Sequence, residues 1–140
     1  VDAPLIRIGP EADGGYLIPD DLDEVHFTEG LHDRKLLMDR LSDAFVVLPG
    51  GLGTLDELFD CLAPKSLHKH QAPIVILDYQ NYFEYLFRFL DHMIREQFAL
   101  EEHRQLWFRA ENISAAFQYL ETYQPPFPFD DLWPDRARTV

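Results

Sequence analysis

The sequence predicts an α/β fold, with a Rossmann-like, doubly wound and mostly parallel sheet that carries helices on both faces. Segments of helical and strand periodicity alternate along residues 31–122, which is typical of α/β domains. Two short runs, residues 44–48 and 74–77, are apolar at every position, as expected for parallel strands that are covered on both faces. Only three strands are predicted, so the sheet would be an incomplete version of this fold.

Each predicted element has its own signal. Leu37, Met38 and Leu41 recur at helical spacing and indicate the first helix. Pro64 should end the second helix, because proline lacks an amide donor and clashes with the preceding turn. Asn112 or Ser114 should cap the last helix. In chain order we predict an irregular segment at 1–30, helices at 31–42, 54–62, 81–98 and 112–123, and strands at 44–48, 74–77 and 105–110. Residues 31–122 would form one Rossmann-like domain, followed by a proline- and aromatic-rich tail at 123–140.

Net charge, cysteine count and the absence of long apolar stretches restrict the partners and the compartment that we expect for this protein. The formal net charge of -13 argues against a nucleic-acid backbone or an anionic membrane surface as the main partner. Cys61 is the single cysteine, so no internal disulfide can form and a reducing compartment is expected. No leader pattern and no apolar stretch of about 18–20 residues is visible. We therefore expect a cytoplasmic protein without a membrane partner.

A glycine-rich turn joins the first predicted strand to the next helix. Its sequence is Pro-Gly-Gly-Leu-Gly-Thr at residues 49–54, and ligands of open α/β sheets bind where strands end. Glycine lets a ligand approach the backbone closely, and a helix start offers free N–H groups and the positive end of the dipole. The turn favours an anion, most readily a phosphate. A plain strand-to-helix turn fits the same glycine pattern.

Charged residues near this turn have two interpretations each. Glu57, three residues after Thr54, fits simple capping of the helix start, or a general base beside a bound anion. Arg34 and Lys35 form an adjacent basic pair in an acidic neighbourhood. They fit a solvated helix face, or a site where Arg34 holds a phosphate or leaving group.

The histidines give no metal signal. His68, His70, His92 and His103 lack the tight spacing of metal ligands, and Cys61 has no partner near it in sequence. We predict no metal and no other cofactor.

With these residues in view, the sequence resembles the LONELY GUY family of cytokinin-activating phosphoribohydrolases. The family's Pro-Gly-Gly-x-Gly-Thr-x-x-Glu motif is complete at residues 49–57. Its Met-His-Glu-Arg-Lys stretch, the methionine that follows and a Ser-Asp-Ala-Phe segment are matched at residues 31–38 and 42–45, with Leu31 and Asp33 as replacements. The resemblance runs from about residue 31 to about residue 120.

The resemblance implies a homodimer or higher homo-oligomer that hydrolyses the N-glycosidic bond of a nucleoside 5'-monophosphate, such as an adenine or cytokinin nucleotide. Arg34 and Glu57 would be the catalytic residues. Lys35 and Met38 would support substrate binding. The positions that would hold the 5'-phosphate are Gly50, Gly51, Gly53 and Thr54. A non-catalytic nucleotide- or phosphate-binding module, or an inactive fragment, remains the alternative.

The chain departs from the family pattern at three places. The family's N-terminal half is missing or replaced, and residues 3–22 resemble either a remnant of a family strand or the opening of methyltransferase-like proteins. Residues 64–68, Pro-Lys-Ser-Leu-His, stand where the family has Trp-x-Gln-Leu-Gly. Ala72 replaces the lysine of the usual Lys-Pro pair.

Overall fold

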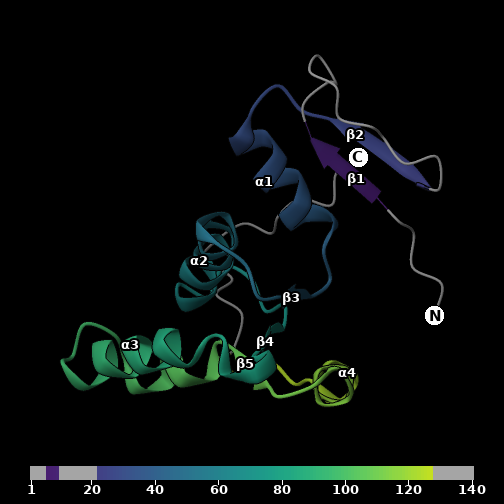
Figure 1. The fold of residues 1–140 in the computed structure, drawn as a ribbon. Coiled ribbons are helices and arrows are strands. Elements are labelled where there is room, and N and C mark those ends of the chain that lie inside the picture. Colours follow the sequence, from purple (N-terminus) through teal and green to yellow (C-terminus); the bar gives the residue numbers. More distant parts are fainter. Residues whose placement is uncertain (1–5, 10–21, 128–140) are drawn as a thin grey trace. The chain divides into compact units, whose positions relative to one another are not determined.

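The structure is a computed structural model that describes residues 6–9 and 22–127 (Figure 1). The chain forms two compact units, Val1–Ser42 and Asp43–Val140. Most of the tail expected at 123–140 lies outside the described residues. The domain limits expected at residues 30 and 122 stay a prediction.

The first unit pairs two short strands with one helix. Strands β1 (Ile6–Gly9) and β2 (Glu24–Phe27) are parallel, with Ile6 opposite Glu24, and helix α1 (Leu31–Leu41) contacts β1. The helix confirms the prediction for this segment. The strands correct the expectation that residues 1–30 are irregular, because pairing between residues distant in sequence defines short strands that propensity alone does not reveal.

The second unit is built on a three-stranded parallel sheet. Its strands are β3 (Phe45–Val47), β4 (Ile74–Leu77) and β5 (Phe108–Ala110), in the order β3-β4-β5. All three were predicted, and β4 has the predicted bounds. Both neighbouring pairs of strands are parallel, so their carboxyl ends meet at one edge of the sheet.

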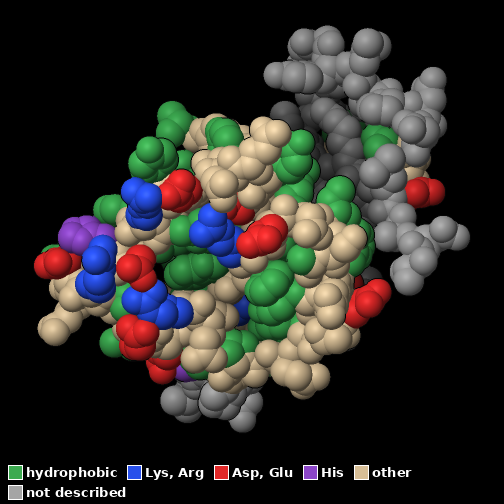
Figure 2. Space-filling view, turned by 60° about the horizontal axis from the view of Figure 1, so that its bottom comes forward, with side chains coloured by type: hydrophobic (Ala, Val, Ile, Leu, Met, Phe, Trp, Pro, Cys, Tyr) green, Lys and Arg blue, Asp and Glu red, His purple; other side chains and the backbone are tan. Residues whose placement is uncertain are grey.

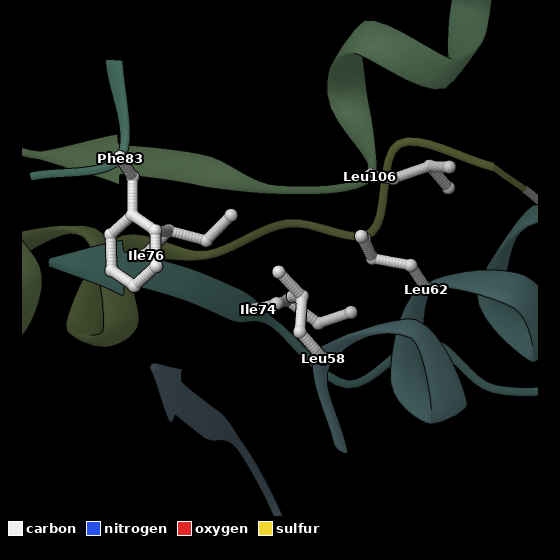
Figure 3. Packing of buried hydrophobic residues seen from close by; sticks show 6 residues of the cluster. All are labelled: Leu58, Leu62, Ile74, Ile76, Phe83 and Leu106. Carbon is white, nitrogen blue, oxygen red and sulfur yellow. The ribbon is translucent and has the colours of Figure 1, made fainter. Parts of the chain in front are cut away.

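Strand β4 forms the centre of the core. Ile74 and Ile76 pack on one face against helix α2 (Leu52–Ser66), and Val75 packs on the other face against helix α4 (Ile113–Thr122). The first cluster comprises Leu58, Leu62, Ile74, Ile76, Phe83 and Leu106 (Figure 3). Each fully buried aliphatic side chain contributes about 1.5–3 kcal/mol. The sheet carries helices on both faces, so the α/β, Rossmann-like prediction is confirmed.

Helix α2 is longer than predicted at both ends. It begins at Leu52, and Pro64 lies inside its last turn instead of ending it. The amides of Leu67 and Lys69 donate to the Pro64 carbonyl at 3.1 and 3.0 Å, and these bonds satisfy the helix end. His68 follows with a φ of 55°, a conformation that glycine adopts most easily. Glycine is the family's residue at this position.

The segment after β4 also differs from the prediction. A 3-10 turn, η1 (Tyr79–Asn81), comes first, and helix α3 spans Glu84–Arg95, shorter than the predicted 81–98. Another 3-10 turn, η2 (Glu101–Gln105), precedes β5. At the last helix, the Asn112 side chain accepts a hydrogen bond from the Ala115 amide at 2.9 Å. This contact identifies Asn112 as the cap.

On the surface that Figure 2 shows, positively charged side chains (blue) and negatively charged side chains (red) lie next to each other. Several of them form ion pairs. Arg88 and Glu84 are 2.5 Å apart, and Arg104 binds both Asp91 and Glu101. The guanidinium of Arg104 lowers the pKa of the Asp91 carboxyl. Within the described ranges, no helix combines the length and the apolar character needed to cross a membrane.

Candidate functional site

The glycine-rich turn connects the carboxyl end of β3 to the start of α2. Gly51 is the N-cap, and as a glycine it has no side chain with which to cap this helix start. The Leu55 amide makes the first helical bond, 3.2 Å from the Gly51 carbonyl. The preceding amides therefore have no partner within the helix, and they carry the positive end of the helix dipole. This geometry suits an anionic group.

The three glycines of the turn have different surroundings. A Cβ added at Gly50 would overlap the Thr54 hydroxyl and lie 3.0 Å from Thr54 Cβ. Added at Gly51 or Gly53, the same atom would meet nothing within 4 Å. Gly50 is needed for packing of the turn against Thr54, whereas Gly51 and Gly53 keep the space beside the helix start open.

Glu57 lies farther into the helix than the sequence indicated. Because α2 begins at Leu52, Glu57 is in the second turn, and the structure records no acidic residue in the first turn. The interaction of a carboxylate with the helix dipole falls off beyond the first turn, so the capping interpretation of Glu57 is wrong. Residues four apart share a helix face, and side chains tilt toward the helix start. Half-buried Glu57 is therefore one turn above Gly53 on the open side.

The other predicted site residues belong to the first unit. Arg34, Lys35 and Met38 are half-buried on α1. The Arg34 amide donates to the Gly30 carbonyl at 3.0 Å, which makes the first helical bond of α1. Arg34 and Met38 are four residues apart and share a helix face. The pairing of Arg34 with Glu57 stays a prediction.

One side chain that the sequence analysis did not consider contacts the glycine-rich turn directly. The Tyr82 hydroxyl donates a hydrogen bond to the Gly50 carbonyl oxygen at 2.8 Å. Tyr82 follows η1, in the loop after β4. The rule that ligands bind beyond the carboxyl ends of parallel strands could have drawn attention to this loop.

Buried Asp78, the first residue after β4, holds that loop in place. Its Oδ1 accepts from the Phe83 amide at 2.7 Å, and its Oδ2 accepts from Arg109 Nε at 2.7 Å and lies 2.5 Å from Arg109 Nη2. Asn81 Oδ1 accepts from the same guanidinium at 3.2 Å. Charge-assisted bonds to a buried carboxylate are strong, so β4, β5 and η1 form a firm support.

Two of the histidines that were considered as metal ligands make structural contacts within the protein. His70 Nε2 lies 2.9 Å from the Cys61 carbonyl oxygen, and the ring of His68 stacks on Phe127 at 5.1 Å. In the described part of the chain, no group of three or more histidine, cysteine, aspartate or glutamate side chains could hold a metal ion.

Fold and turn together define a Rossmann-like α/β protein with an anion-compatible helix start. Residues 7–120 match the family model described as possible lysine decarboxylase, so the chain belongs to this family, and the LONELY GUY resemblance is confirmed. It is 37% identical over 102 residues to the cytokinin riboside 5'-monophosphate phosphoribohydrolase LOG5 of Arabidopsis thaliana. A probable enzyme of the same name, LOGL9 of Oryza sativa subsp. japonica, is 34% identical over 122 residues.

The match also bears on the N-terminal segment. These alignments cover 73% and 87% of this chain but 45% and 52% of the two relatives, so the chain spans about half of their length. The family match starts at residue 7, earlier than the expected residue 31. This start favours a family strand over a methyltransferase-like opening for these residues, in agreement with β1.

Proposed function

We propose that the chain hydrolyses the N-glycosidic bond of a nucleoside 5'-monophosphate, and releases a free base and ribose 5-phosphate. The family and the names of the relatives support a phosphoribohydrolase of the cytokinin type. The observation that carries the proposal for this chain is the open space at Gly51 and Gly53, beside the start of α2, where the N-cap is a glycine. That space can admit a phosphate to the helix amides.

In the proposed reaction the phosphate is the anchor and Glu57 acts on the ribose. The amides after Gly51, with Gly53 and the Thr54 hydroxyl, would bind the 5'-phosphate. Binding energy from this remote group would position the glycosidic bond. Cleavage develops positive charge on the ribose, as in other glycoside hydrolyses. The Glu57 carboxylate would stabilise this charge or orient the attacking water.

For three residues of α1 we propose the roles that the family resemblance implies. Arg34 would stabilise the leaving group or the phosphate with its planar guanidinium, and Lys35 and Met38 would support binding. We also propose a homodimer or higher homo-oligomer in the cytoplasm.

The test is release of adenine from AMP, compared with release from a modified adenine nucleotide. Glu57→Gln should lower the rate by about 10²–10⁴-fold, the usual contribution of a positioned acid or base. Asp56→Asn is the matched control, because it neutralises the neighbouring exposed carboxylate of the same helix. Arg34→Ala should also lose activity, whereas Arg40→Ala in the last turn of α1 should retain it. Full activity in both Glu57→Gln and Arg34→Ala would refute the residue roles.

A second candidate is a nucleotide-binding module without turnover. It is motivated by the chain spanning about half the length of its relatives. It predicts AMP binding without base release at any enzyme concentration, and this result would overturn the proposed reaction while leaving the phosphate site intact.

A further inference from the structure

The bond between Tyr82 and the glycine-rich turn links two loops at the same edge of the sheet. Gly50 follows β3 and Tyr82 follows β4, and these two strands are parallel neighbours. The Tyr82 hydroxyl reaches the Gly50 carbonyl at 2.8 Å across 32 residues of sequence. Because the acceptor is the carbonyl oxygen of Gly50, the bond contacts the backbone of the turn directly.

The tyrosine is held in this position by its neighbours. Its ring packs edge-on against Phe83, with the centroids 5.0 Å apart, and Phe83 is 3% exposed in the main core cluster. The Phe83 amide is fixed by buried Asp78, which in turn binds Arg109 of β5. Tyr82 itself is 54% exposed, but the contacts of Phe83 with its ring and of Asp78 with the next amide restrain its position.

The backbone just before Tyr82 is strained. Gln80 and Asn81 have φ values of 54° and 58°, in the left-handed region, which asparagine tolerates but which is strained for glutamine. Strain of this kind persists only where the surrounding contacts enforce it, and it clusters at functional sites. The bond from Arg109 to the Asn81 side chain is one such contact.

We propose that Tyr82 is a positioning residue for the phosphate-binding turn. By holding the Gly50 carbonyl, its hydroxyl fixes the orientation of the peptides at Gly51–Gly53, and hence the direction of the amides that meet the phosphate. This inference rests on the proposed function. Tyr82 acts through Gly50 and is not itself assigned to the reacting atoms.

The test is Tyr82→Phe, which removes only the hydroxyl and keeps the ring on Phe83. Tyr85→Phe is the matched control, because Tyr85 is 79% exposed on α3 and its ring faces Arg88, a contact that phenylalanine keeps. Loss of one hydrogen bond changes an equilibrium by about 2- to 12-fold. We therefore expect Tyr82→Phe to raise the KM for AMP and its Kd by about that factor, with little change in kcat, and Tyr85→Phe to match the wild type.

A second readout separates this inference from the proposed function. Backbone amide relaxation should show lower order parameters at Gly50–Gly53 in Tyr82→Phe without any nucleotide present, and wild-type values in Tyr85→Phe. If the wild type neither binds nor hydrolyses AMP, the proposed function fails and this measurement still tests the tether. Unchanged order parameters and an unchanged KM in Tyr82→Phe would overturn the inference. A lower melting temperature with an unchanged KM would also overturn it, since that marks a structural role alone.

Discussion

Substitution of the glycines in the turn by alanine should separate packing from ligand binding. Gly53 is the second residue of α2, and its added Cβ would meet nothing within 4 Å. Alanine in a helix is more stable than glycine by about 0.5–1 kcal/mol. For a unit of this size, the melting temperature of Gly53→Ala should rise by about 2–8 °C. The new methyl group would occupy the space that the phosphate needs, so affinity for AMP should fall at least about 10-fold, or about 1.4 kcal/mol.

Gly50→Ala should lower the stability of the protein. Its Cβ would overlap the Thr54 hydroxyl and lie 3.0 Å from Thr54 Cβ, and overpacking of this kind costs about 1–3 kcal/mol. The assays are thermal unfolding followed by circular dichroism and titration with AMP by calorimetry. Wild-type affinity in a stabilised Gly53→Ala would refute the assignment of the phosphate to this space. Equal melting temperatures for the two variants would refute the packing argument.

Two further predictions concern stability. Burial lowers the pKa of Lys65 to about 8 from 10.5. The folded state therefore releases its proton before the unfolded state does, and stability should rise between about pH 8 and 10 relative to Lys65→Met, by at most about 3 kcal/mol. Above pH 10 the stability of both proteins should fall together, because burial raises the pKa of Tyr123 to about 12 from 10 and both proteins keep this tyrosine. A flat difference between the two proteins in urea unfolding would contradict this. Separately, exposed Gln97 has a φ of 65° just after α3, so Gln97→Gly should stabilise the protein by about 0.5–1 kcal/mol, with Glu96→Gly as a destabilising control in the same melts.

The sequence predicted the second unit well, because its strongest signals are local. Strand β4 is apolar at every position and buried on both faces, so its bounds were predicted without error. Asn112 follows the propensity of its side chain to cap a helix. The end of α2 was mispredicted, because the helix continues past Pro64 to Ser66. Just after the proline, buried Lys65 donates to the Ala72 carbonyl at 2.9 Å, a contact that the local sequence pattern does not show.

The N-terminal strands could not be predicted from local sequence signals. The segments Ile6–Gly9 and Glu24–Phe27 are short and flanked by turn residues, and their pairing joins residues 18 positions apart. Contacts of this range are set by the folded chain and leave little trace in local composition. The family match from residue 7 agrees with their presence.

At the candidate site, the sequence by itself determined the glycine-rich turn, the carboxylate of Glu57 and the family, since these depend on residue types at fixed spacing. Only the tertiary structure decided that Gly50 packs on Thr54 while Gly51 and Gly53 face open space. It also showed that Glu57 lies beyond the first helical turn, and that the Tyr82 hydroxyl donates a hydrogen bond to the Gly50 carbonyl. The physical reason is that these features depend on where the helix begins and on which loops adjacent parallel strands bring together.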